Sequence, residues 1–224
     1  MDFGREFEVD FVSLWKLFLK IMAYTQFKKI EQLRIAFGIH TQKTVWLPQV
    51  ALHTAMSAIL QQSLSEAMFE PLGSEKAKSE LIVVPILKEL RRNNNMCFSA
   101  FSGYSFEVDK AKGLTGFCDF ILSASPLSTE IMTPIFCLVE AKKADIEEGI
   151  GQCGAEMYAA KLYNEREEKP RDVMYGCVTN AFSWCFLKLE NNILYIDPNY
   201  VPLTFASPHQ VLAVLQWILD ESLK

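Results

Sequence analysis

Two short apolar segments carry acidic side chains where a buried strand ordinarily carries none. The segment 116–122 reads Gly-Phe-Cys-Asp-Phe-Ile-Leu, and the segment 136–143 reads Phe-Cys-Leu-Val-Glu-Ala-Lys-Lys. Short apolar runs of this kind predict two strands of a buried sheet. An isolated carboxylate inside such a sheet costs on the order of several kcal/mol unless it is paired, protonated or bound to a metal ion. Asp119 therefore requires a partner, and either Lys142 or a shared cation would serve.

The second of these strands ends in a Glu-x-Lys pattern. Because side chains alternate along a strand, Glu140 and Lys142 are expected on the same face, roughly 6–7 Å apart along the chain. An ammonium at this position could reach a water molecule bound to a cation that the carboxylate holds, which is a geometry suited to hydrolysis. The alternative is a strand that emerges into solvent with a charged end. The apolar surroundings of Asp119 favour the first interpretation.

Length and composition indicate one well-filled domain. The chain has 224 residues, and half of them are hydrophobic. We expect an N-terminal helical extension over residues 1–70, packed on a domain over residues 71–224. The net charge of −5 does not favour a nucleic-acid partner. Local basic clusters partly offset this charge, and they comprise Lys88, Arg91, Arg92, Lys110, Lys112, Lys142 and Lys143.

Cysteine usage and the N-terminal segment bear on the cellular compartment. The six cysteines form no CxxC pair and lie mostly in apolar patterns, so they are interpreted as small core residues in a reducing compartment. The apolar segment 7–22 carries too many charges to span a membrane, and its acidic start does not fit a signal peptide. Met22 is a second candidate start, which would make residues 1–21 an upstream extension. These features predict a cytoplasmic protein without a membrane partner.

Apolar periodicity and turn residues predict the order of elements. Helices are expected over 9–24, 25–38, 48–68, 75–92, 145–164 and 210–223, and strands over 97–108, 116–123, 134–142, 174–190 with an internal break, and 193–201. Gly38 is a suitable left-handed cap for the second helix, and Pro85 is expected to kink the fourth. The glycines at 149, 151 and 154 would let their helix pack closely against the sheet. The order defines a mixed α/β fold, a central mixed sheet flanked by helices.

Two acidic residues of the predicted helix 75–92 are interpreted differently. Glu80 shares a helical stripe with Val83 and Leu87, so its carboxylate is expected to point toward the core side. Glu89 lies among basic neighbours and is expected to be a solvated charge. Glu80 is therefore the candidate for a functional role.

The order of these elements and acidic positions resembles the PD-(D/E)XK nuclease superfamily, which has the restriction-endonuclease-like fold. The resemblance depends on Glu80 in the first helix, Asp119 in the second strand, the Glu140-Ala-Lys142 run in the third strand and Gln152 in the following helix. The segment 75–91 is also similar to the opening helix of uncharacterised bacterial members. The likeness covers about residues 74–200 and leaves the N-terminal helices outside it.

The resemblance implies a role for each of these residues. Asp119, Glu140 and the backbone carbonyl of Ala141 would bind Mg²⁺, or Mn²⁺ as a substitute, because such cations prefer hard oxygen ligands. Lys142 would position or deprotonate the attacking water and balance negative charge on the phosphate. Glu80 would hold a second cation, directly or through water. Gln152 would orient the water or the nucleic-acid backbone.

Two positions depart from the pattern of the superfamily. Cys118 stands where the family name has proline, at a position without a chemical role. Glu156 stands four residues after Gln152, where many relatives have an aromatic residue. The second departure separates the chain from the exonuclease branch.

The sequence therefore predicts a Mg²⁺-dependent nuclease that hydrolyses phosphodiester bonds, with DNA favoured over RNA as its partner. The first alternative is a catalytically inactive protein of the same fold that serves as a binding or interaction module, which the acidic net charge would suit. The second is a metal-dependent hydrolase of small phosphate esters. A homodimer stays open as an assembly.

Overall fold

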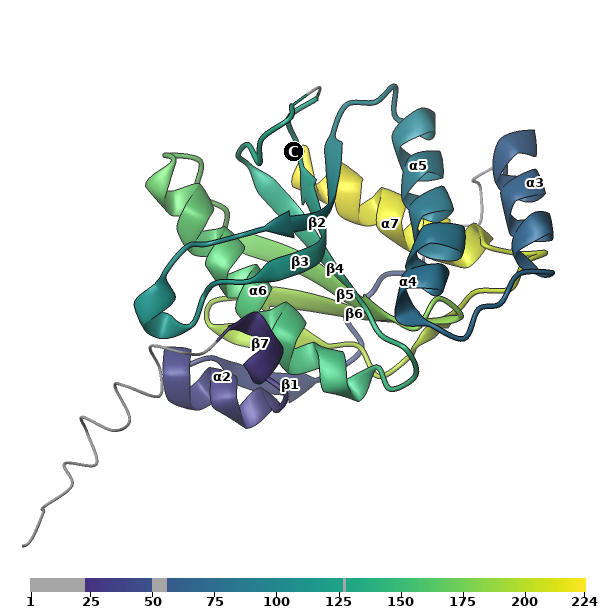
Figure 1. Ribbon diagram of the computed structural model, residues 1–224. Helices are drawn as coiled ribbons and strands as arrows, with labels where there is room; N and C mark the ends of the chain where they lie inside the picture. The colour runs from purple at the N-terminus through teal and green to yellow at the C-terminus, as the bar shows by residue number, and fades with distance from the viewer. Residues whose placement is uncertain (1–22, 50–55, 127) are drawn as a thin grey trace, which may run out of the picture.

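A mixed sheet forms the centre of the chain (Figure 1). The computed structural model describes residues 23–49, 56–126 and 128–224, and these residues form eight strands of one sheet. The strands are β1 (His40–Lys43), β2 (Ser99–Ser105), β3 (Phe117–Ser123), β4 (Ile135–Ala141), β5 (Val173–Thr179), β6 (Ser183–Glu190), β7 (Ile193–Ile196) and β8 (Val201–Pro202). Their order is β1-β7-β6-β5-β4-β3-β2, and β8 pairs with β6. The expected α/β class with a mixed sheet is confirmed.

The strand directions divide the sheet into two antiparallel groups. Strands β2, β3 and β4 are antiparallel neighbours, as are β5, β6 and β7. Strand β5 runs parallel to β4 and joins the groups at the centre of the sheet. Parallel neighbours need a crossover connection, which α6 (Glu147–Arg166) provides. Strand β1, within the predicted N-terminal extension, pairs in parallel with β7 at the sheet edge.

Helices cover both faces of the sheet. The remaining helical elements are η1 (Tyr24–Gln26), α2 (Ile30–Phe37), α3 (Ala58–Ala67), α4 (Glu75–Lys78), the π-helical η2 (Ser79–Val83), α5 (Val84–Asn93), η3 (Lys110–Lys112) and α7 (His209–Ser222). Helices α3, α5 and α7 bury their apolar residues in one core, together with Phe136 and Trp184 of the sheet. Helices α2 and α6 form a second core with Leu138 and Leu187. Figure 1 shows α5 and α7 on the opposite side of the sheet from α6.

Helix α6 lies unusually close to its neighbours because of its glycines. A Cβ atom at Gly149 would lie 2.6 Å from Cγ1 of Val178 in β5 and 3.0 Å from Cε of Lys142. A Cβ atom at Gly151 would lie 2.3 Å from the backbone oxygen of Phe27. Side chains are not tolerated at such distances, so the expected close packing of this helix is confirmed. Its partners are both the sheet and the segment that follows η1.

The predicted helix 75–92 is helical throughout but is not a regular α-helix. It consists of α4, the π-helical turn η2 and α5, with Pro85 in the first turn of α5. The helical backbone is continuous through these elements, since Lys78, Val83 and Val84 all have right-handed helical angles and the N–H of Val84 donates to the carbonyl of Ser79. The π-helical turn thus lies directly before Pro85, where the regular hydrogen-bond pattern of an α-helix is interrupted. The other predicted helices also differ at their ends. Gly38 has a φ of 69° and caps α2 as expected, but that helix begins at Ile30, after a 3₁₀ turn.

Some predicted elements lie outside the described residues, and others differ from the structure. The helix over 9–24 lies almost entirely outside the described residues, and so does part of the helix over 48–68. The strand expected over 193–201 is divided into β7 and β8. Strand β1 was not predicted, because its His-Thr-Gln-Lys sequence is polar and all four residues are exposed.

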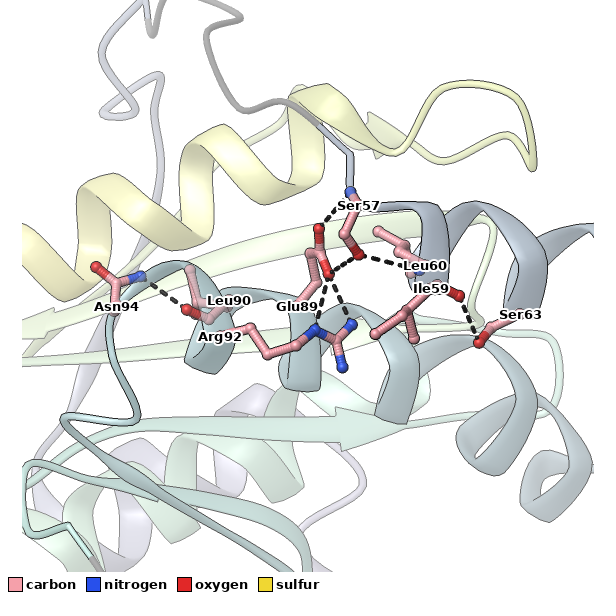
Figure 2. A network of polar contacts seen from close by, with 8 residues as sticks. All are labelled: Ser57, Ile59, Leu60, Ser63, Glu89, Leu90, Arg92 and Asn94. Carbon is pink, nitrogen blue, oxygen red and sulfur yellow. Dashed lines mark hydrogen bonds and ion pairs between the residues drawn. The ribbon is translucent and has the colours of Figure 1, made fainter.

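Glu89 is buried rather than solvated. Its carboxylate accepts hydrogen bonds from the backbone N–H and the hydroxyl of Ser57, at 2.7 and 2.8 Å, and forms an ion pair with Arg92 at 2.6 Å (Figure 2). The side chain of Ser57 also caps α3 by accepting from the N–H of Leu60. The expectation of a surface charge is wrong because α3 covers this face of α5, a long-range contact that local charge pattern does not contain. Glu89 thereby ties α3 to α5.

The cysteines behave as expected. All six are free thiols, five of them buried and Cys97 half-buried. In the part of the chain that the structure describes, no helix is long and apolar enough to cross a membrane.

Candidate active site

The candidate residues gather where β4 and β5 end and α6 begins. Ala141 and Thr179 are the last paired residues of the two parallel strands. The N–H of Lys142 donates to the backbone oxygen of Thr179 at 2.8 Å, which extends the contact by one residue. Functional side chains at the carboxyl ends of parallel strands point into the space at that edge of a sheet. The site thus occupies a position that α/β folds commonly use.

Asp119 lies at the point where β3 and β4 separate. Regular pairing of these strands ends with Phe120 opposite Val139. Beyond it, the N–H of Ala141 donates to Oδ2 of Asp119 at 2.8 Å. The Asp119 side chain therefore takes the place of a ladder carbonyl, and its carboxylate is held beside the end of β4.

Lys142 joins the predicted residues into one cluster. Its Nζ lies 2.5 Å from Oε1 of Glu140 and donates to Oε1 of Gln152 at 3.1 Å. The exposed fraction of the Glu140 side chain is 2%, and that of Lys142 is 18%. The expectation that Glu140 and Lys142 share a face is confirmed, and the alternative of a solvated strand end is wrong because both side chains are largely buried.

Glu156 completes the cluster from α6. The side-chain amide of Gln152 donates to Oε1 of Glu156 at 3.1 Å, one helical turn away. Glu156 is fully buried. Oε2 of Glu156 and Oε2 of Glu140 are both buried, and neither has a hydrogen-bond partner among the described residues. The site therefore contains two buried carboxylate oxygens that nothing in the described protein satisfies.

Burial opposes the ionisation of all three carboxyl groups of the cluster. Burial raises the pKa of Glu156 to about 8. Burial, together with the nearby charges of Glu156 and Asp119, raises the pKa of Glu140 well above its usual range. Burial also raises the pKa of Asp119, although the hydrogen bond from Ala141 acts in the opposite direction. Three ionised carboxylates against the single ammonium of Lys142 would leave an excess of two negative charges, so protons or a cation must compensate them.

Lys142 is a cation in this arrangement. Burial disfavours its charge, but the adjacent carboxylate of Glu140 outweighs burial and raises the pKa of Lys142. A lysine with a raised pKa holds its proton at neutral pH. It can therefore donate hydrogen bonds to an anion, whereas it is poorly suited to accept a proton from water.

The donor set suits a hard divalent cation, although its side chains do not enclose one point. Among the described residues, no group of three or more His, Cys, Asp or Glu side chains is arranged as a metal centre. The ammonium of Lys142 lies on Glu140 instead. The unsatisfied oxygens of Glu140 and Glu156 nevertheless fit the oxygen ligands that Mg²⁺ prefers.

Glu80 does not belong to the site. Its side chain is 62% exposed and forms an ion pair with Lys76 on the same helical segment, at 3.8 Å. The expected orientation toward the core is wrong because Glu80 lies in the π-helical turn η2, where the 3.6-residue period does not hold. The acid of this segment that acts on the site is Glu75, whose charge raises the pKa values of both Asp119 and Lys142.

Glu156 and Glu75 were not among the site residues predicted from the sequence, and the sequence contains a signal only for Glu156. Glu156 stands among small and apolar residues of α6, between Ala155 and Met157, where a solvated charge is not expected. It lies one helical turn from Gln152, so the two side chains share a face. Glu75 gives no comparable signal. It follows the N-cap Ser74, where an acidic residue is ordinary.

Comparison with known proteins finds no family model that matches the chain and no matching curated protein. Its function is therefore inferred from the fold and from this cluster of buried charges.

Proposed function

We propose that the protein is a Mg²⁺-dependent nuclease of the restriction-endonuclease-like fold, which hydrolyses phosphodiester bonds of nucleic acid, with DNA favoured over RNA. The observation that carries the proposal is the cluster that the buried Glu140 and Glu156 and the half-buried Asp119 form with the ammonium of Lys142. Its excess negative charge and its two unsatisfied oxygens favour a divalent cation.

The arrangement of elements supports the proposed fold. Helix α5 precedes the antiparallel strands β2, β3 and β4, and α6 then leads to β5, which is parallel to β4. The candidate residues come from β3, β4 and α6, in the order in which the resemblance expects them. The acid of the first helical segment differs, because Glu80 is exposed, and Glu75 is the acid of this segment whose charge acts on Asp119 and Lys142.

Asp119, Glu140 and the carbonyl oxygen of Ala141 would hold the Mg²⁺ ion, for which Mn²⁺ would substitute. The bound ion would neutralise charge on the scissile phosphate and polarise it for attack. Oδ2 of Asp119 accepts from the N–H of Ala141, so Oδ1 would be the oxygen that binds the ion. One carboxylate oxygen would then hold the end of β4 in place, and the other would bind the ion.

Lys142 and Gln152 supply the remaining chemistry of the chain. Gln152 holds the Lys142 ammonium within the cluster. From there Lys142 can orient a water molecule and donate to the phosphate as its negative charge increases. Because its pKa is raised, we assign it the role of a donor rather than that of a general base.

The test compares two adjacent lysines. Purified wild-type protein is incubated with single- and double-stranded DNA and RNA, with Mg²⁺, Mn²⁺ or EDTA. We expect divalent-dependent cleavage that Lys142→Ala reduces at least about 100-fold. The control Lys143→Ala, at an exposed neighbouring side chain, should cleave at the wild-type rate. Unchanged thermal unfolding would show that Lys142→Ala keeps the fold. Absence of cleavage by the wild-type protein on every substrate would contradict the proposal.

A second candidate function is a binding module without catalytic activity. The observation in its favour is that Lys142 and the N–H of Ala141 already engage Glu140 and Asp119, so that part of the site is satisfied within the protein. Metal titration separates the two functions. A nuclease should gain thermal stability with Mg²⁺ or Mn²⁺, because a ligand that binds only the folded state stabilises it. A binding module should unfold at the same temperature with and without these ions.

A further inference from the structure

We propose that Glu156 of α6 is a ligand for a divalent cation, held between the unsatisfied oxygens of Glu140 and Glu156 on the side of the cluster that faces the helix. This inference deepens the proposed function, because it adds a cation position to the same site. The ligand class is a small, hard divalent cation such as Mg²⁺ or Mn²⁺.

The burial of these two carboxyl groups is the first observation. Glu140 is 1% exposed, and Glu156 is fully buried. Each has one oxygen engaged, by Lys142 in the first case and by Gln152 in the second. The other oxygen of each is buried without a partner. A buried carboxylate oxygen without a donor is costly, so a residue of this kind requires a compensating ligand or a proton.

The mutual position of the two groups is the second observation. Glu140 and Glu156 are close enough for the charge of Glu156 to raise the pKa of Glu140. Two ionised carboxylates at this separation repel each other unless a cation or a proton lies between them. A divalent cation compensates both charges at once, whereas one proton compensates only one of them.

The support for Glu156 is the third observation. Gln152 donates to Glu156 and accepts from Lys142, so one amide fixes both ends of the cluster. Helix α6 is held against the sheet by the close approach of Gly149 to Val178. The Glu156 carboxylate is therefore presented from a rigid element, as a metal ligand requires. Glu140 would be shared between this position and the one formed with Asp119 and the carbonyl of Ala141.

The experiment measures Mn²⁺ binding to the full chain without nucleic acid, by the loss of the free Mn²⁺ electron paramagnetic resonance signal. Glu156→Gln keeps the size of the side chain and removes its charge. We expect this variant to bind Mn²⁺ at least tenfold more weakly or to lose one equivalent of the ion. The control Glu148→Gln removes an exposed charge from the same helix and should bind as the wild type does.

A second variant covers the case in which Glu156→Gln fails to fold. Glu156→Asp keeps the charge and withdraws the oxygens by one methylene, and we expect it also to weaken Mn²⁺ binding. Wild-type affinity and stoichiometry in either folded variant would overturn the inference, and would identify Glu156 as a buried, protonated acid. Absence of Mn²⁺ binding by the wild-type protein would overturn it as well.

Cleavage assays on the same proteins separate this inference from the proposed function. Mn²⁺ binding that depends on Glu156 in a protein that cuts no nucleic acid supports the inference and contradicts the nuclease. If the protein shows metal-dependent cleavage but its Mn²⁺ binding is unchanged by substitution of Glu156, the result supports the nuclease and contradicts the inference.

Discussion

The carboxylate of Asp119 accepts a hydrogen bond from the backbone N–H of Ala141 at 2.8 Å, across the point where β3 and β4 stop pairing. The same aspartate is a proposed cation ligand, and the carbonyl of Ala141 is another. One side chain thus connects the strand geometry to the chemistry of the site.

Two substitutions of Asp119 should separate these roles. Asp119→Asn keeps an oxygen that can accept from Ala141, so we expect nearly wild-type stability and loss of divalent-dependent cleavage. Asp119→Ala leaves the N–H of Ala141 without its acceptor and should lower the free energy of unfolding by about 1–3 kcal/mol. Urea unfolding and cleavage assays measure the two effects. Full activity in Asp119→Asn would show that the residue is structural only.

Gly149→Ala should disturb Lys142 directly. The added methyl group would lie 2.6 Å from Cγ1 of Val178 and 3.0 Å from Cε of Lys142. We expect a lower unfolding temperature and cleavage reduced by about tenfold or more, since small displacements of catalytic groups are costly. Gly73→Ala is the matched control, because its added Cβ would meet no atom within 4 Å. Equal behaviour of the two variants would contradict the close packing of α6.

Glu75 and Glu80 should differ in their effect on cleavage. The charge of Glu75 acts on Asp119 and Lys142, whereas Glu80 is exposed and paired with Lys76. We expect Glu75→Gln to weaken Mg²⁺-dependent cleavage by about tenfold, as outer-sphere substitutions at metal sites commonly do. Glu80→Gln should leave it unchanged. The Mg²⁺ concentration at half-maximal cleavage is the measurement, and the opposite ranking would restore Glu80 to the site.

The stability of the metal-free protein should fall as the pH rises from about 4.5 to about 8. The pKa of Glu156 is raised from 4.5 to about 8 in the folded state, so the folded protein binds more protons than the unfolded chain in this range. The contribution of the protonated group is complete below pH 4.5 and is lost as the pH rises through 8. Denaturant unfolding of Glu156→Gln should lack this part of the slope, about 1.4 kcal/mol per pH unit. A similar slope in both proteins would contradict the raised pKa.

Glu89→Ala should destabilise the protein by about 3–5 kcal/mol, because it leaves Arg92 and the N–H of Ser57 without a buried partner. Burial opposes the charge of Glu89, but the hydrogen bonds from Ser57 and Arg92 outweigh it and lower the pKa of the group. This stabilisation is therefore present above about pH 4.5 and is lost on acidification. Glu66→Ala, at an exposed residue of α3, should change the unfolding transition little. If both variants unfold alike, Glu89 does not hold α3 to α5.

The strands around the site were predictable because their apolar runs are local and unambiguous. Residues 117–123 and 135–141 form β3 and β4 close to the expected bounds, and the glycines of α6 indicated close packing. Strand β1 was not predictable in this way. Its polar residues pair with β7, about 150 positions later in the chain, and no periodicity marks such an edge strand.

The acids of the site were predictable only where a charge interrupts an apolar pattern. Asp119 and Glu140 do so in strands, and Glu156 does so in α6. The exposure of Glu80 depends on a π-helical turn, and the burial of Glu89 depends on contact with Ser57. Neither feature can be derived from a helical period. The π-helical turn changes the period itself, and Ser57 belongs to a distant segment of the chain.

The β4–α6–β5 crossover has a consequence for the order in which the protein folds. Glu140, Lys142, Gln152 and Glu156 all belong to this one supersecondary unit, within 17 consecutive positions of the chain. Contacts between near neighbours form faster than distant ones because less chain entropy is lost. We therefore expect these four residues to come together early in folding. The pairing of β3 with β4 should then add Asp119 to the cluster at a later step.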